Sequence, residues 1–363
     1  MIRMLISALL LSMPFAGALA VTNDFDHQPS QEQLQKSIAH NKARSLEVQP
    51  MAAWPVVKPF NEIENTGFVA ISGAEAYELG ALREAIARNL PAGVTLVVYV
   101  KNANEAAPLK RLLSPHLSSE QLKFLIVPTN FSSNPIWGRD SLPFPVYVQP
   151  RADAEGDVSG LVDSIYPQSF EPDIAFANAF GQASVKTGYE FRGGNLLFDE
   201  DINCFATRAN EILGIDDPED FFKRYFGCKT LTIMPHDGGI GDIDERVKFL
   251  PGKVVLTDNQ GHAQILRGMG YDVRMFPSTG SYYRTYMNTL VVNDTIFVPQ
   301  MGIAKDQDAL DAYEAVGFKA VGVYTRQLAD RGHGNIHCLT MNYPQGSFVA
   351  SPLGSDFVKF PGR

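Results

Sequence analysis

The sequence predicts a single α/β domain, because segments typical of strands and of helices alternate along most of its 363 residues. The connections between these segments are mostly short, and no Pro/Ser-rich linker divides the chain. The composition, with 45% hydrophobic and 20% charged residues, is that of an ordinary folded protein. It excludes a disordered or low-complexity chain, which would be poorer in apolar residues.

The first elements follow one another regularly. In chain order we predict a strand at 67–72, a helix at 74–89, a strand at 94–100, a helix at 103–113 and a strand at 122–127. Further strands are predicted at 144–148, 195–198, 230–234, 254–257, 290–298 and 320–324. Helices are predicted between them at 173–180, 218–226, 262–269 and 307–316.

Residues 1–20 have the pattern of a secretory signal peptide, with an early Arg3, an apolar run and small residues at its end. A membrane anchor is the alternative, but the apolar run is short and is broken by Pro14 and Gly17. We therefore expect a secreted or periplasmic protein. No later segment is long and apolar enough to cross a bilayer.

Residues 21–59 are polar, with a helical stretch at 31–46 and no strand pattern, and we interpret them as an N-terminal arm. The remaining residues, 60–363, form the predicted catalytic domain. With 31 basic against 40 acidic residues the formal net charge is -9, and no basic stripe is present. This excludes a nucleic-acid partner and weakly favours encounter with a cationic substrate.

The chain has three cysteines, Cys204, Cys228 and Cys338, so at most one disulfide can form within it. If Cys204 pairs with Cys228, then Cys338 is left as a free and reactive thiol. The alternative for each is a small buried hydrophobic residue. The glycine-rich run 238–241 lacks the lysine and spacing of nucleotide-binding loops, so no nucleotide cofactor is predicted.

Four short polar segments interrupt the strand-like runs, at 137–140, 193–195, 241–244 and 332–338. Taken singly, Asp140 is as well explained as a turn residue, Asp244 as a cap and Asn288 as a strand-edge residue. Together they predict chemistry. A thiol beside a histidine can act as a nucleophile, and two separated carboxylates match the fixed N–H fork of a guanidinium group.

These segments resemble the bacterial peptidylarginine deiminase and agmatine deiminase family. The resemblance runs from about residue 60 to the C-terminus in the family's order, and Gly-Asn-Ile-His-Cys at 334–338 is its most specific part. The other matching elements are Trp137-x-Arg139-Asp140-x-x-Pro143, Gly193-Gly194, Asp244 with the hydrophobic run to Phe249, and the strand with Asn288. The resemblance implies the pentein fold, in which five ββαβ units surround a central active site.

The resemblance also implies a hydrolase acting on the C–N bonds of amidines. Cys338 would attack the guanidinium carbon, release ammonia and leave a covalent thiouronium for water to hydrolyse. Asp140 and Asp244 would bind the guanidinium nitrogens, and Asn288 matches a polar residue near the nucleophile. No metal or organic cofactor is implied. Trp137 and Arg139, which neighbour Asp140, are assigned to substrate binding together with the two aspartates.

One departure from the family concerns the general acid and base. The family has a histidine two residues before the second aspartate, where this chain has Asp242. An ordinary aspartate is too acidic for this work. Asp242 would need a raised pKa, which crowding with the other two aspartates favours and a bound guanidinium opposes. His236 and His333 are the alternative bases.

A second departure is Arg192, where agmatine deiminases carry a glutamate before Gly-Gly. This argues against a small dicationic substrate such as agmatine, and leaves Arg139 and Arg192 to meet a substrate carboxylate or to form structural salt bridges. With the export signal it favours a peptidylarginine deiminase that converts arginine to citrulline. The alternatives are an agmatine deiminase-like or amidinotransferase activity on a small guanidino compound, or a silent arginine-binding pentein.

Overall fold

A computed structural model describes residues 27–45, 56–131, 133–148, 158–164, 166, 170–208, 212, 214–346 and 357–358. The predicted signal peptide lies outside these residues, so it stays a prediction together with the secreted or periplasmic location. Within the described ranges, no helix combines the length and apolar character needed to cross a membrane.

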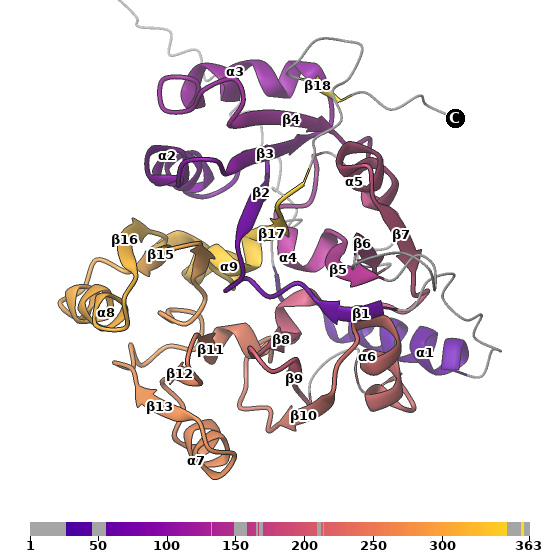
Figure 1. Cartoon of the computed structure of the whole chain (residues 1–363), viewed down its shortest axis with the longest axis vertical. Coiled ribbons are helices and arrows are strands. Elements are labelled where there is room, and N and C mark those ends of the chain that lie inside the picture. The colour runs from indigo at the N-terminus through magenta and orange to yellow at the C-terminus, as the bar shows by residue number, and fades with distance from the viewer. Residues whose placement is uncertain are drawn as a thin grey trace, which may run out of the picture.

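The strands form five separate sheets grouped around a common centre (Figure 1). In each sheet a first strand runs antiparallel to a second, and the second runs parallel to a third across a connecting helix. Four of these ββαβ units are continuous in the chain: β5 (Phe144–Val148), β6 (Val158–Asp163), α5 (Asp173–Phe180), β7 (Ala183–Lys186); β8 (Leu197–Phe198), β9 (Asn203–Thr207), α6 (Pro218–Phe226), β10 (Thr230–Met234); β11 (Val247–Leu250), β12 (Val254–Thr257), α7 (Gln260–Gly268), β13 (Asp272–Met275); and β14 (Leu290–Val292), β15 (Thr295–Gln300), α8 (Lys305–Glu314), β16 (Lys319–Tyr324).

The fifth unit joins the two ends of the folded chain. Its first strand is β17 (Thr340–Pro344), which pairs antiparallel with β2 (Thr66–Ser72). The unit continues through α2 (Leu79–Asn89), β3 (Thr95–Val100), α3 (Ala103–Leu113), β4 (Leu122–Ile126) and β18 (Phe357–Val358). The predicted α/β fold class is therefore confirmed, and the strand order repeats the ββαβ pattern that the resemblance implied.

Strand β3 shows why some strands read as continuous apolar runs. Its Val97 and Tyr99 belong to one hydrophobic cluster, and its Leu96, Val98 and Val100 belong to another. All five side chains are fully buried. A parallel strand covered on both faces needs apolar residues at every position, which is what the sequence supplies.

Three sequence predictions need correction. The helix predicted from residue 74 begins at Leu79, and the preceding Tyr77 has a positive φ of 44° that no helix continues. The single strand predicted at 290–298 is the hairpin of β14 and β15, which turns at Asn293 with φ of 57°. The arm also contains a strand, β1 (Val56–Pro59), which pairs with β5. It is short and ends in proline, so no alternation is visible.

Cys204 in β9 and Cys228, two residues after α6, form a disulfide with their Cα atoms 5.7 Å apart. This spacing lies in the ordinary range for a disulfide. The bond resolves the pairing that the sequence left open. Cys338 is the free cysteine and is completely buried.

The helix expected in the arm is α1 (Gln31–Ser45), and it is held to the body by polar contacts. The Asn41 side chain donates from Nδ2 to the carbonyl oxygen of Glu190 at 2.7 Å, and accepts from the Glu190 N–H at 2.9 Å. Ser37 Oγ donates to the carboxylate of Glu190 at 2.5 Å, and His40 Nε2 lies 2.9 Å from the carbonyl oxygen of Gly188. These contacts fix the segment that precedes α1 against the centre of the molecule.

Candidate active site

The candidate site lies at the centre, where the segments that lead into the first strand of each unit meet (Figure 1). Four of these lead-in segments are short helical turns, so hydrogen bonds of the backbone hold their side chains in place. The lead-in segments are α4 (Gly138–Ser141) before β5, η1 (Gly193–Asn195) before β8, η3 (Ile243–Glu245) before β11, residues 285–289 before β14, and α9 (Ile336–Leu339) before β17. They bring together Asp140, Gly194, Asp244, Asn288 and Cys338.

Asn288 orients the predicted nucleophile. Its Nδ2 donates to Cys338 Sγ at 2.9 Å, and its Oδ1 accepts the Cys338 backbone N–H at 3.2 Å. The sulfur atom then lies 3.4 Å from Asp244 Oδ2 and 3.6 Å from Glu245 Oε1. The thiol is therefore held between an amide donor and two carboxyl groups.

These carboxyl groups control the charge on the sulfur. Burial, assisted by the nearby Asp244, Glu245 and Asp140, raises the pKa of the Cys338 thiol well above its ordinary value. Burial and the charge of Asp244 likewise raise the pKa of Glu245. The raised pKa favours the protonated thiol. A cationic substrate would bring a positive charge among the carboxylates and favour the nucleophilic thiolate.

One carboxylate oxygen of Asp244 is available to accept a hydrogen bond from a ligand. Its Oδ2 accepts from His337 Nδ1 at 2.7 Å, whereas its buried Oδ1 has no hydrogen-bond partner among the described residues. An unsatisfied buried carboxylate oxygen is costly, and an N–H donor of a bound cation would satisfy it. Gly194 leaves space for such a group, since a Cβ there would lie 3.1 Å from oxygens of both Asp242 and Asp244.

Asp140 is the second predicted guanidinium ligand, and only 1% of its surface is exposed. Its Oδ1 accepts the Gly194 backbone N–H at 2.9 Å, and its Oδ2 lies 2.5 Å from His27 Nε2. Burial alone would raise the pKa of Asp140, but His27, Arg192 and the Gly194 N–H together lower it. Asp140 is therefore an ionised carboxylate with acceptor capacity left on each oxygen.

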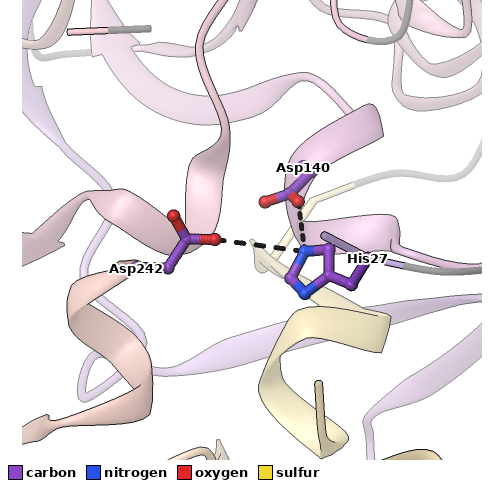
Figure 2. Close-up of side chains that lie close together, drawn as sticks. All are labelled: His27, Asp140 and Asp242. Atoms are coloured by element: carbon purple, nitrogen blue, oxygen red, sulfur yellow. Dashed lines mark hydrogen bonds and ion pairs between the residues drawn. The ribbon is translucent and has the colours of Figure 1, made fainter. Parts of the chain in front are cut away.

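His27 is a site residue that the sequence analysis missed. Figure 2 shows one ring nitrogen of His27 facing the carboxylates of both Asp140 and Asp242, and this Nε2 atom lies 4.0 Å from Asp242 Oδ2. The ring stacks on Trp137 with 4.4 Å between ring centroids, and its Nδ1 lies 3.2 Å from the carbonyl oxygen of His333. No local signal marks His27, because it precedes a polar helix and lies more than a hundred residues from every motif of the site.

The two departures from the family pattern contact each other. Arg192 Nη2 lies 3.0 Å from Asp242 Oδ1, and both side chains are fully buried. The same nitrogen donates to the carbonyl oxygen of Ile240 at 3.1 Å. The charge of Arg192 is thereby balanced by Asp242 within the protein. Its predicted contact with a substrate carboxylate stays a prediction.

The other predicted residues have different surroundings. Arg139 is buried and donates to Met341 Sδ at 3.4 Å and to Asn342 Oδ1 at 3.3 Å, both on β17. His236 is exposed in the loop after β10. The ring of His333 packs against Tyr283 with a centroid distance of 4.7 Å, and its carbonyl oxygen faces His27. A role for Asp242, His236 or His333 as the base stays a prediction.

His337 was also missed, although it directly precedes Cys338 in the most specific motif. Its Nδ1 contacts Asp244, and its Nε2 lies 3.4 Å from Glu62 Oε2. Burial opposes the ionisation of Glu62, but Lys248 and His337 outweigh it and lower the pKa of Glu62. The series of polar contacts from Glu62 through His337 to Asp244 fixes the orientation of the carboxylate next to the nucleophile.

Two groups of side chains place potential metal ligands within 4.8 Å of one another: His27, Asp140 and Asp242, and Asp244, Glu245 and Cys338. Atoms of both groups already take part in the hydrogen bonds described above, and Asp242 pairs with Arg192. We assign no metal to either group. The expectation that no cofactor is needed stays a prediction.

Comparisons with known proteins agree with the resemblance noted in the sequence. The family model of Porphyromonas-type peptidyl-arginine deiminases matches residues 264–344. A protein of Marinomonas sp. strain MWYL1 described as an agmatine deiminase is 24% identical over 338 residues, covering 74% of this chain and 86% of that protein. A protein of Streptococcus mutans with the same description is 42% identical over 246 residues, covering 51% of this chain and 66% of that protein.

Among solved structures, the agmatine deiminase of C. jejuni superposes with a TM-score of 0.63 and 15% identity. The superposition covers 80% of this chain and 96% of that protein. The fold described above is therefore shared with that deiminase.

Proposed function

We propose that this chain, a relative of the bacterial peptidylarginine deiminase and agmatine deiminase family, hydrolyses the guanidino group of a small cationic substrate through Cys338. The chain is a hydrolase of amidine C–N bonds, as the resemblance implied. The proposal adds the substrate class and the residues that do the work.

One observation carries the proposal. The thiol of Cys338 lies 3.4 Å from Asp244, a buried carboxylate whose second oxygen has no hydrogen-bond donor among the described residues. Asp140, whose Oδ1 accepts the Gly194 N–H, presents a second carboxylate next to the same glycine. A guanidinium offers N–H donors along two edges of a plane, so it can bind both carboxylates and present its carbon to the sulfur.

The reaction follows from this geometry. Binding of the cation favours loss of the thiol proton to water, and the thiolate of Cys338 forms a C–S bond with the guanidinium carbon. A C–N bond then breaks and ammonia leaves, giving a thiouronium. Water adds to the same carbon, the C–S bond breaks, and the ureido product departs as the sulfur regains a proton. The thiol proton and one proton of the attacking water go to the departing nitrogen, which ends as ammonium, and the other proton of that water returns to the sulfur.

Burial of the site supports a small substrate. Asp140, Asp244, Asn288 and Cys338 are each at most 1% exposed, and His27 contacts Asp140. The relatives described as agmatine deiminases support the same choice. The argument against a dicationic substrate was the charge of Arg192, and pairing with Asp242 balances that charge. The small-substrate alternative is therefore favoured over arginine residues in a peptide.

The proposal is tested by incubating the protein with agmatine, free arginine and a blocked arginine peptide, and assaying ureido product and ammonia. We expect turnover of a small guanidino compound. Cys338→Ala should remove it completely, because the covalent intermediate forms on the sulfur of this residue. The thermal unfolding midpoint of the variant reports whether it is still folded.

Other outcomes would change the proposal in distinct ways. Product from the peptide alone would restore peptidylarginine deimination as the function. Product without stoichiometric ammonia, when an amine acceptor is present, would indicate amidino transfer. Binding of agmatine or arginine without any product would identify a silent binding protein, and activity in the Cys338→Ala variant would exclude the covalent route.

A further inference from the structure

We propose that His27, supplied by the N-terminal arm, is the acid–base catalyst of this site. The inference rests on the proposed function, because it assigns the proton transfers of that reaction to one imidazole. His27 lies in the segment before α1, outside the five ββαβ units that carry the other site residues.

The reaction needs a group that both gives and takes a proton near neutral pH. It must protonate departing ammonia and later accept a proton from water, for which an imidazole is suited and an ordinary carboxylate is too acidic. Asp242 stands in an ion pair with Arg192 at 3.0 Å, which favours its charged form and makes it a poor proton donor. The imidazole of His27 approaches the same carboxylate to 4.0 Å.

Both ring nitrogens of His27 face oxygen atoms. Nδ1 faces the carbonyl oxygen of His333 at 3.2 Å, and Nε2 faces the carboxylate of Asp140 at 2.5 Å. Both partners are acceptors, so the ring satisfies both only when both nitrogens carry a proton. A ring with a proton on both nitrogens is also the form needed to donate a proton to the leaving group.

The surroundings hold the ring in one orientation. It stacks on Trp137 at an interplanar angle of 23°, and the His27 backbone N–H donates to the carbonyl oxygen of Gly332 at 2.9 Å. A Cβ on Gly334 would lie 2.9 Å from His27 Nδ1 and 2.6 Å from the Trp137 ring, so the glycine makes room for both. Ring, indole and loop fit as one packed unit.

The charged groups around His27 favour its part in the reaction. Asp140 contacts the ring and is also the predicted ligand of the guanidinium, so the ring lies beside the nitrogen that leaves. Asp242 adds a second negative charge, which Arg192 partly balances. The imidazolium gives its Nε2 proton to the departing nitrogen, the C–N bond breaks, and the neutral ring takes a proton from the water that attacks the thiouronium carbon.

Chemical rescue tests this assignment. The experiment compares the wild-type protein with His27→Ala, His27→Gln, Cys338→Ala and the control His116→Ala, a half-buried histidine that contacts Glu84. The substrate is the guanidino compound that the wild-type protein turns over. We expect His27→Ala to lower kcat by about 100-fold or more with a smaller change in KM. Added imidazole should restore much of the lost kcat by entering the space beside Trp137.

His27→Gln should be equally inactive and should not respond to imidazole, because glutamine fills the space without transferring a proton. His116→Ala should keep wild-type kcat with and without imidazole. Unchanged kcat in His27→Ala would overturn the assignment, and so would rescue absent from a folded variant. An increase in kcat would instead show that the ring blocks the site. If the wild-type protein turned over no guanidino compound, the proposed function would be rejected. That outcome is distinct from the loss of the role proposed for His27.

Discussion

At the scale of single residues, the pair of Arg192 and Asp242 shows what the sequence could and could not predict. Each position was recognisable as a departure from the family pattern, but the two lie fifty residues apart and nothing in the sequence joins them. In the structure they form one buried ion pair. A glutamate and a histidine in the family are thus replaced by an arginine and an aspartate that also match each other in charge.

This pair gives a prediction for stability. Asp242→Asn should lower the free energy of unfolding by about 3 kcal/mol or more, because it leaves the Arg192 guanidinium buried without its partner. Arg192→Gln should act similarly, and the double variant should lose much less than the sum of the two. Urea unfolding measures all three. The exposed pair Arg274 and Asp272 should show almost no coupling in the same cycle, and additive effects for the buried pair would contradict the argument.

The candidate site was predictable to the extent that its residues stand in motifs. Asp140, Asp244, Asn288 and Cys338 were chosen from the sequence, and the folded chain brings them together. His27 could not be chosen, because its role depends on where the arm folds back. That path is set by contacts of α1 that have no periodic pattern, such as the hydrogen bonds between Asn41 and Glu190.

At the scale of elements, long helices and continuous strands were predictable and short strands were not. The helices α3, α5 and α6 have the bounds that the sequence predicted. Strands such as β8, with two residues, and β11, with four, are too short for an alternating pattern to be visible. The five-unit arrangement followed from the resemblance alone, since alternating strands and helices fit many α/β folds.

The end of β6 gives a prediction about pH. Burial, together with the charge of Asp173 at the start of α5, raises the pKa of Asp163 to about 8. In the unfolded chain the pKa is about 3.9. Between these values the folded state binds the extra proton, so the free energy of unfolding falls as pH rises, by up to about 1.4 kcal/mol per pH unit.

Asp163→Asn removes this dependence. The midpoint of unfolding of the variant should rise steadily relative to that of the wild-type protein from pH 4.5 to pH 7.5, because asparagine remains neutral throughout. Asp201→Asn, at the exposed turn before β9, serves as the matched control and should show a constant difference. A difference for Asp163→Asn that does not change with pH would contradict the raised pKa.

At the scale of the whole molecule, the site depends on all five units, because each contributes one lead-in segment to the centre. A change within one sheet can therefore reach the site without touching it. The disulfide between Cys204 and Cys228 braces one such unit, linking β9 to the chain just beyond α6. Thr207, at the end of the same strand, donates from its N–H and its hydroxyl to Asn195 Oδ1 of η1, and its carbonyl oxygen accepts from Asn195 Nδ2.

Removing this disulfide tests how the unit is stabilised. The double variant Cys204→Ala/Cys228→Ala should lose about 3 kcal/mol of unfolding free energy, because a loop with a sequence separation of 24 is no longer closed in the unfolded chain. Activity at 25 °C should remain, since Cys338 is untouched. Reductant should bring the wild-type protein close to the variant and leave the variant unchanged; a variant as stable as the wild-type protein would mean that the bond adds little.

The pairing of β17 with β2 also bears on the order in which the chain is synthesised. The sheet that contains β2 receives its antiparallel strand, β17, only after residues 340–344 have left the ribosome. Cys338 lies just before that strand. The carboxylates at Asp140 and Asp244 are made far earlier. A chain that ends before residue 338 therefore lacks its reactive sulfur, and catalytic competence arrives only when the segment of Cys338 and β17 has been made.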